Sequence, residues 1–350
     1  MSKENILKHY NAYPKMELQD LYKYLYQSAF GCEHMVSSIE NVEAHLITEA
    51  ENVEKHSDTL IEALDGEYRR VHLSYLKKGL SPKTFAKLFS LSAKIEPDGK
   101  EKLKEKLSIL RELVAEKKLP FDIDEVDAKI KEWESEDYPS VHHTASFREN
   151  YAPAYRLVAK KFIPFLPLFA EIDKLIEKNP FGILAIEGKC ASGKTTLSQI
   201  LKDIYDCNVF HMDDFFLRVE QRTKERYSEA GENIDHERFL EEVLIPLKKG
   251  ETVHYRRLNC STMEIEEGIQ YKERKLTIIE GTYSMHPDLA PYYDKKVFLE
   301  IGEKLQKERI ERRNSPEMAQ RFFNEWIPLE NEYFSKLNIK EKCDITIKVV

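Results

Sequence analysis

The chain has 350 residues, enough for two domains, and its composition is that of an ordinary globular protein with a formal net charge of −8. This acidity argues against duplex nucleic acid or an anionic membrane as a main partner, but it leaves room for small anionic ligands in a local cationic pocket. No apolar run approaches the roughly 18 residues that span a bilayer. The five cysteines form no C-x-x-C pair, which favours free thiols and a cytoplasmic location. Association into a homo-oligomer stays open.

Residues 1–160 are predicted to form an all-α domain. Apolar side chains recur at helical spacing within residues 18–25 and again within residues 42–64. Ser81-Pro82 is typical of a helix start, with proline at the first helical position. Residues 99–118 are rich in Lys, Glu and Leu, which indicates a solvated amphipathic helix. No segment with the alternation of a strand stands out in this half.

Two polar and aromatic segments of this half, residues 14–34 and 141–156, leave two alternatives open. Their Tyr, Gln, Arg and His side chains either line a polar pocket or belong to a helical bundle whose half-buried aromatic rings keep their polar tips in water. A metal site would draw on His34, His142 and His143, although no carboxylate or cysteine spacing supports one.

After a connector at residues 161–180, the pattern changes at residue 181. Short β-rich runs alternate with helical ones to the end of the chain, which predicts βαβ units and a parallel sheet covered by helices. Residues 181–350 are therefore expected to form one α/β domain. The β-rich runs are Phe181–Glu187, Asn208–Met212, Leu276–Glu280, Lys296–Ile301 and Asp344–Val349.

A glycine-rich loop follows the first of these runs and precedes a helical segment. Its pattern is G-x-x-x-x-G-K-T, and the order strand, loop, helix is the context of a phosphate-binding loop in a P-loop NTPase fold. In such a loop, backbone N–H groups bind phosphate oxygens, the lysine reaches the outer phosphates and the threonine hydroxyl binds Mg²⁺. We therefore expect the chain to bind ATP or GTP with Mg²⁺. The expected nucleotide contacts are Gly188, Cys190, Ala191, Ser192, Gly193, Lys194, Thr195 and Thr196.

Ionisable side chains follow the later β-rich runs, where ligands of open α/β sheets bind. Asp213 is placed to accept a proton from an acceptor hydroxyl or to hold Mg²⁺ through water, unless it caps a turn. Glu280 ends its run where a Walker-B-type carboxylate helps Thr195 to organise Mg²⁺. Arginines share one helical face after the fourth run and suit the charge of a transferring phosphoryl group. These are Arg309, Arg312 and Arg313.

Residues 181–350 resemble the uridine kinase and phosphoribulokinase family of P-loop kinases, on six features in the same order. Besides the phosphate-binding loop, residues 213–216 are similar to the family's D-x-F-Y segment, whose Asp is the catalytic base. Residues 233–239 are similar to its F-D-H-P-x-A-F segment, whose Asp contacts ribose hydroxyls. The segment before the nucleobase-contacting loop, the E-G strand end and the lid arginines also have counterparts. The resemblance implies acceptor contacts from Asp235, His236, Tyr255 and Arg257.

The chain departs from the family pattern in the acceptor region. Glu237 replaces a proline, residues 255–259 differ from the family's tyrosine-aspartate-phenylalanine segment, and residues 314–318 lack its charged, glycine-containing lid. The favoured hypothesis is a small-molecule kinase that acts on a nucleoside, uridine- or cytidine-like, or on a sugar-like acceptor. A nucleotide-gated regulatory module, with the amino-terminal half as effector, is the alternative. A third hypothesis, a kinase acting on RNA or protein ends, is disfavoured by the acidity of the chain.

Overall fold

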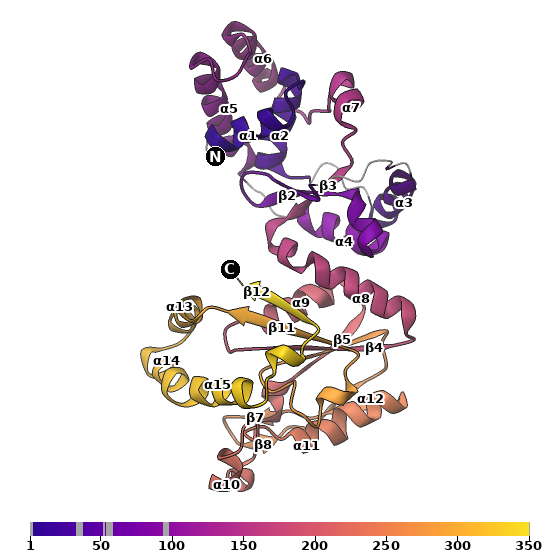
Figure 1. Ribbon diagram of the computed structural model, residues 1–350, viewed down its shortest axis with the longest axis vertical. Helices are drawn as coiled ribbons and strands as arrows, with labels where there is room; N and C mark the ends of the chain where they lie inside the picture. Colours follow the sequence, from indigo (N-terminus) through magenta and orange to yellow (C-terminus); the bar gives the residue numbers. More distant parts are fainter. Residues whose placement is uncertain (1–2, 33–37, 52, 54–58, 94–97, 350) are drawn as a thin grey trace. The chain divides into compact units, whose positions relative to one another are not determined.

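The chain divides into two compact units, residues 1–171 and residues 172–350 (Figure 1). The division falls within helix α8 (Leu166–Lys178). No helix among the residues described is long and apolar enough to cross a membrane. The computed structural model describes residues 3–32, 38–51, 53, 59–93 and 98–349.

The first unit is mostly helical, and its helices follow the apolar periodicity of the sequence. Helix α2 is buried along most of its length. Ser81 caps helix α4 as expected, because its hydroxyl accepts a hydrogen bond from the Thr84 N–H at 3.1 Å. The helices are α1 (Lys3–Ala12), α2 (Leu18–Phe30), α3 (Ile39–Glu51), α4 (Pro82–Ser92), α5 (Gly99–Ala115), α6 (Ile123–Ser135) and α7 (Ala145–Tyr151).

The first unit is not all-α, because it also contains a three-stranded antiparallel sheet, β1-β2-β3. The prediction of helix up to residue 64 is wrong at its end, where β1 runs. The apolar alternation of a strand is not visible in β2, because one of its buried positions is Arg70, which is only 2% exposed. The guanidinium pairs with Glu62 at 3.2 Å and donates to Gln27 at 2.8 Å. The strands are β1 (Ile61–Ala63), β2 (Tyr68–His72) and β3 (Tyr155–Ala159).

His143 lies in the buried polar network of this unit, with both ring nitrogens bonded. Nδ1 is 3.0 Å from the Asp20 carboxylate and Nε2 is 2.8 Å from the Tyr155 hydroxyl. Burial lowers the pKa of His143, which favours the neutral ring. His34 lies outside the described residues, and no group of metal-ligating side chains comes together in the described part of this unit. The polar groups of His143, Asp20 and Tyr155 therefore bond to one another within the packed unit.

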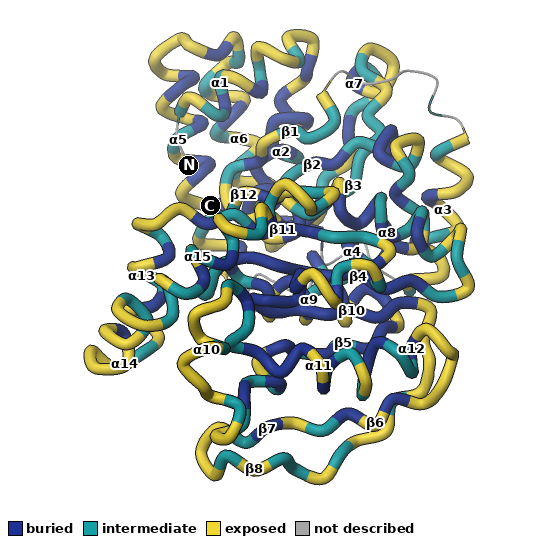
Figure 2. The backbone as a smooth tube through the Cα atoms, turned by 60° about the horizontal axis from the view of Figure 1, so that its bottom comes forward, coloured by how far each residue is buried: buried dark blue, intermediate teal, exposed yellow. Residues whose placement is uncertain are grey.

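The second unit is built on a five-stranded parallel sheet of order β12-β11-β4-β10-β5. The strands agree with the predicted β-rich runs to within one residue at each end. Central strand β4 is buried at every position, which explains its continuous apolar run (Figure 2). The strands are β4 (Gly182–Gly188), β5 (Cys207–His211), β10 (Leu276–Glu280), β11 (Lys295–Ile301) and β12 (Ile345–Val349).

Helices cover the sheet. One face packs a core in which Ile183 and Ile279 meet Phe239, Leu247 and Tyr333 from the helices beneath it. Helix α9 lies on the other face (Figure 1). Two short antiparallel strand pairs follow helix α12 (Ile245–Lys249). One joins β6 (Val253–Tyr255) to β9 (Ile269–Tyr271), and the other joins β7 (Leu258–Asn259) to β8 (Glu264–Ile265). The helices of this unit are α9 (Lys194–Ile204), α10 (Lys224–Tyr227), α11 (His236–Phe239), α12 (Ile245–Lys249), α13 (Glu303–Arg313), α14 (Pro316–Arg321) and α15 (Ile327–Lys336).

Glu187, the penultimate residue of β4, is fully buried and ties three segments together. Its carboxylate accepts hydrogen bonds from the Gly188 N–H at 2.8 Å, the Met285 N–H at 3.0 Å and the Tyr333 hydroxyl at 3.0 Å. Burial raises the pKa of Glu187 from 4.5 to about 7, while Lys194 and the backbone donors oppose the shift. The folded state therefore binds this proton more tightly than the unfolded state does. The stability that the proton contributes to the folded state is lost as the pH rises from 4.5 through about 7.

Tyr333→Phe tests this tie. At pH 8, where the Glu187 carboxyl is charged, losing one hydrogen bond to a buried charge should lower the free energy of unfolding by about 1.5–3 kcal/mol. At pH 5 the carboxyl is protonated, so the loss should fall to about 0.5–1.5 kcal/mol. Urea unfolding at both pH values measures the two quantities.

Tyr293→Phe is the matched control. The Tyr293 ring is also buried, but its hydroxyl has no hydrogen-bond partner among the described residues. Its removal should change stability by less than about 0.5 kcal/mol or raise it. Equal losses in the two variants would contradict the role assigned to the Glu187–Tyr333 bond.

Candidate nucleotide-binding site

The loop between β4 and α9 has the backbone of a phosphate cradle. Gly188 has φ +149°, and a Cβ there would lie 2.6 Å from the Leu299 carbonyl oxygen, so only glycine fits. Gly193 has φ +98° and is the N-cap of α9. Ala191 also takes a positive φ, +61°. These conformations turn the loop around the helix N-terminus, where backbone N–H groups bind anions.

Lys194 lies folded into this loop and is buried. Its ammonium donates to the carbonyl oxygens of Gly188 at 2.7 Å and Lys189 at 3.1 Å, and to the Thr282 hydroxyl at 3.1 Å. Thr282, which lies two residues beyond the end of β10, was not singled out from the sequence. The charge of Lys194 is thus held at the mouth of the loop by neutral acceptors. Phosphate oxygens fit this donor, because they supply the counter-charge that these acceptors lack.

Thr195, Glu280 and His211 meet at the carboxyl end of the sheet. The Thr195 hydroxyl donates to Glu280 Oε1 at 3.0 Å, and His211 Nδ1 lies 2.6 Å from the same oxygen. This hydrogen bond raises the pKa of His211 and favours its charged form. A hydroxyl beside a carboxylate is an oxygen donor set suited to Mg²⁺. His211 was not singled out from the sequence, and only its position as the last residue of β5 pointed to it.

Asp213 lies on the turn after β5 and is exposed to solvent. Desolvation by the surrounding protein raises the pKa of Asp213, and the carboxylates of Glu280 and Asp214 raise it further, while Lys194 opposes the shift. The charges of the phosphate-binding loop and of the β10 strand end therefore act on Asp213. The structure brings this predicted residue to the same edge of the sheet as Lys194 and Glu280.

Two helices that follow β11 also contact the loop. From α15, the Glu330 carboxylate accepts a hydrogen bond from the Cys190 N–H at 2.9 Å, so it takes a donor that such a loop offers to phosphate. Burial raises the pKa of Glu330, although Lys194 opposes this. From α13, Gln306 donates to the Cys190 carbonyl at 3.1 Å and Arg309 to the Ala191 carbonyl at 3.2 Å. Nothing in the sequence singled out Glu330 or Gln306.

The other residues predicted for the nucleotide site lie in different surroundings. Arg313 lies over the ring of Phe322, 5.2 Å from its centroid, and Arg312 is exposed on α13. Thr196 is exposed in the first turn of α9. Burial raises the pKa of the Cys190 thiol to about 12, which keeps it protonated and unreactive. Of the three predicted arginines, the structure thus brings Arg309 to the loop.

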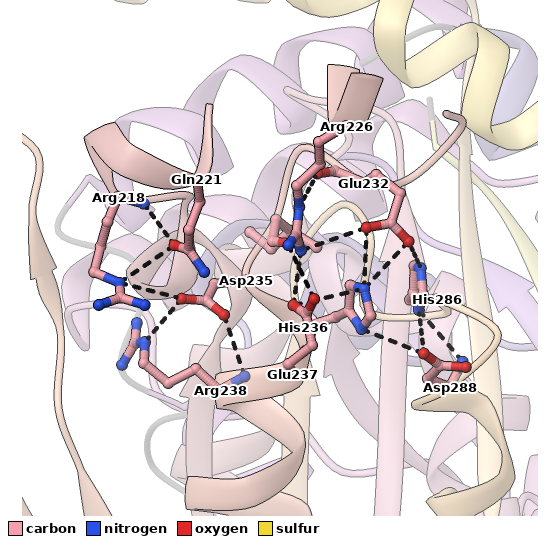
Figure 3. Close-up of polar contacts among 11 residues, drawn as sticks. Arg218, Gln221, Arg226, Glu232, Asp235, His236, Glu237, Arg238, His286 and Asp288 are labelled. Carbon is pink, nitrogen blue, oxygen red and sulfur yellow. Dashed lines mark hydrogen bonds and ion pairs between the residues drawn. The ribbon is translucent and has the colours of Figure 1, made fainter. Parts of the chain in front are cut away.

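Asp235 caps helix α11 and is 2% exposed (Figure 3). Its Oδ1 accepts a hydrogen bond from the Arg238 N–H at 3.2 Å. Its Oδ2 has no hydrogen-bond partner within the described chain, and the nearest guanidinium nitrogens, from Arg238 and Arg218, lie at 3.6 and 3.7 Å. A buried carboxylate oxygen with unused acceptor capacity suits a hydroxyl donor.

The other residues predicted for the acceptor site lie in different settings. Tyr255 is buried, and its hydroxyl donates to Asp214 Oδ2 at 2.5 Å, so it holds the turn that carries Asp213. Arg257 is exposed and pairs with Glu266 at 3.2 Å. His236 is buried beside Asp235 but faces a different set of partners, described below.

Several solved structures of kinases are similar to part of this chain. A possible uridine kinase from Bacillus stearothermophilus is 20% identical, over 51% of this chain and 99% of that chain, with a TM-score of 0.39. A candidate fructose transport system kinase from Silicibacter sp. TM1040 is 23% identical over 48% and 89%, with a TM-score of 0.40. A shikimate kinase from Bacteroides thetaiotaomicron is 13% identical over 48% and 86%, with a TM-score of 0.26. No protein-family model and no curated protein matches the chain.

Glu330→Gln tests whether this carboxylate competes with phosphate. Two like charges about 4 Å apart repel by roughly 4 kcal/mol at the dielectric of a protein surface, so removing one should tighten ATP binding by at least about tenfold. Isothermal titration calorimetry measures the Kd. Glu332→Gln, on the same helix, where the partly exposed carboxylate pairs with Lys336, should leave it unchanged. Weaker binding in Glu330→Gln would mean that the carboxylate supports the nucleotide instead.

Proposed function

We propose that residues 172–350 form an ATP- and Mg²⁺-dependent kinase that transfers the γ-phosphoryl group to a hydroxyl of a small molecule. The observation that carries this proposal is the convergence of Lys194, the Thr195–Glu280 pair and Asp213 at the carboxyl edge of one parallel sheet. A phosphate cradle and a metal-binding pair also serve nucleotide switches. A carboxylate beside them that is placed to accept a proton favours phosphoryl transfer to a hydroxyl.

Each residue has a separate task in this mechanism. The loop N–H groups and Lys194 bind the phosphates and neutralise charge on the transferring group. Thr195 and Glu280 would hold Mg²⁺, which supplies further charge neutralisation when bound. Asp213 accepts the proton of the acceptor hydroxyl, and Arg309 adds positive charge beside the loop. The rate enhancement comes mainly from positioning and electrostatics.

The acceptor class follows from the polar groups near Asp235. Its Oδ2, which accepts no hydrogen bond from the described residues, suits an acceptor with a second hydroxyl next to the reacting one, such as a nucleoside or a sugar. The partly exposed guanidinium of Arg218 lies 3.7 Å away and can give way to such a ligand. Uridine and cytidine head the panel to be tested, because the family resemblance points to them.

Asp213→Asn should lower kcat by roughly 10²- to 10⁴-fold with little change in the Kd for ATP, since the amide cannot accept the proton but keeps the shape of the side chain. ADP release with a panel of nucleosides and sugars measures turnover. Asp203→Asn on α9, remote from the catalytic edge, is the control. Full activity of Asp213→Asn would exclude it as the base. Tight ATP binding without stimulation by any panel member would support the regulatory-module alternative.

The pH dependence gives an independent check on Asp213. The base must be charged to act, so kcat/KM falls as the pH drops through its raised pKa, and the acid limb should lie above the usual Asp value of about 4. Asp214→Asn removes one carboxylate that raises this pKa, so the limb should move to lower pH. A limb that stays in place in this variant would contradict the assignment.

A further inference from the structure

Two buried histidines lie against each other outside the nucleotide site. His236, in the first turn of α11, and His286, in the loop after β10, stack with ring centroids 3.8 Å apart and a tilt of 17°. Both are about 5% exposed. Figure 3 shows Glu232 on one side of the two rings and Asp288 on the other. Each ring turns its Nε2 toward Glu232 and its Nδ1 toward Asp288.

The hydrogen bonds leave this pair incompletely satisfied. Glu232 Oε1 lies 3.2 Å from His236 Nε2 and 3.3 Å from His286 Nε2. His286 Nδ1 accepts from the Asp288 N–H at 3.3 Å, but His236 Nδ1 has no hydrogen-bond partner among the described residues. The Asp288 carboxylate lies 3.4 Å from this nitrogen. In either neutral tautomer, therefore, one lone pair of His236 faces a carboxylate.

A positive charge resolves this conflict. His286 is already engaged at both nitrogens, so the conflict concerns His236. A cation between Glu232 and the two Nε2 atoms removes it and engages both rings at once. The protons then move to the Nδ1 atoms, on the side of the Asp288 carboxylate, which lies 3.4 and 4.0 Å away. For His286 this replaces the bond from the Asp288 N–H. A carboxylate behind a ligating histidine is the usual outer-shell partner.

The surrounding charges favour a dication. Three carboxylates, Glu232, Glu237 and Asp288, lie within 4.0 Å of the rings, and one guanidinium, Arg226, pairs with Glu232 and Glu237. The local net charge is thus −2. Arg226 contacts Glu232 Oε2 at 3.4 Å and leaves Oε1, which lies 3.2 and 3.3 Å from the Nε2 atoms of His236 and His286, for another cation. Asp288 and Glu237 are more than half exposed, which provides a route for an ion.

We propose that Glu232, His236 and His286 bind a divalent transition metal of the Zn²⁺ type, with Asp288 orienting the rings. One oxygen and two nitrogens form the ligand set of many three-residue zinc sites, and bonds of about 2.0–2.2 Å to a tetrahedral ion put ligand atoms roughly 3.3–3.5 Å apart. The two Glu232–histidine separations, 3.2 and 3.3 Å, are close to this value. The stacked rings must rotate slightly for their lone pairs to converge on the ion.

The site would join two segments that flank the proposed acceptor region. His236 follows Asp235 directly, and His286 lies six residues beyond Glu280. A metal here would fix α11 against the loop after β10. It needs no nucleotide and no phosphotransfer, so its test is independent of the proposed function.

Co²⁺ is the probe, because tetrahedral Co²⁺ absorbs visible light whereas Zn²⁺ is silent. Chelator-treated full-length protein without nucleotide should bind one equivalent of Co²⁺ with intense visible bands, and Zn²⁺ should bleach them. Near-ultraviolet thiolate bands should be missing, since no cysteine belongs to the site. Proton NMR of the Co²⁺ form should show two hyperfine-shifted, exchangeable imidazole N–H signals, which identify two histidine ligands without any variant. A lack of visible bands, or of these two signals, would overturn the proposal.

Variants then assign the ligands. Glu232→Gln and His286→Gln should abolish the visible bands, whereas Asp288→Asn should weaken Co²⁺ binding by about 10- to 100-fold, as loss of an outer-shell partner does. His254→Gln, at an exposed histidine, and Asp213→Asn, at the nucleotide site, should retain them. Circular dichroism checks that each variant is folded. Bands that persist in folded Glu232→Gln and His286→Gln, or that vanish in Asp213→Asn, would place the metal elsewhere and contradict the proposal.

Discussion

The buried carboxylate of Glu187 is the interaction on which the rest of the second unit depends. It sits at the end of the central strand and accepts hydrogen bonds from the first N–H of the phosphate-binding loop, from the loop after β10 and from α15. A buried charge without such donors would cost several kcal/mol. Because Glu187 is bonded in this way, three segments distant in sequence are held at one edge of the sheet. The loop after β10 then supplies Thr282 to Lys194, and α15 brings Glu330 to Cys190.

In this structure the polar groups of the phosphate-binding loop are bonded to other groups of the protein. Lys194 is bonded to loop carbonyls, the Cys190 N–H to a carboxylate, and Arg309 to the Ala191 carbonyl. Each of these contacts stands where a phosphate oxygen would offer a stronger, charge-assisted partner. Nucleotide binding on the proposed function is therefore an exchange of partners within a preformed cradle. The carboxylates of Glu330 and Asp213, which interact with the charge of Lys194, also make the region more acidic than the loop motif suggests.

The sequence predicted the second unit well because its information is local. Buried parallel strands are continuous apolar runs, and the glycine spacing of the loop matches the φ values that Gly188 and Gly193 adopt. The sheet of the first unit was missed for the opposite reason. Strand β1 has three residues, and β2 buries Arg70 where a pattern of apolar residues would be sought. The Glu62 carboxylate and the Gln27 amide compensate the burial of that arginine. No local sequence pattern shows these partners.

By itself, then, the sequence determined the strand–loop–helix unit, the order of the β-rich runs and the placement of Asp213 and Glu280 at strand ends. Only the tertiary structure decided that Glu330 reaches the Cys190 N–H across 140 positions of the chain, that His211 shares an oxygen of Glu280 with Thr195, and that His236 stacks on His286. The physical reason is the same throughout. Backbone conformation follows from neighbours in sequence, whereas the pairing of buried charges and hydrogen-bonding groups depends on which distant side chains the packed sheet brings within 3–4 Å.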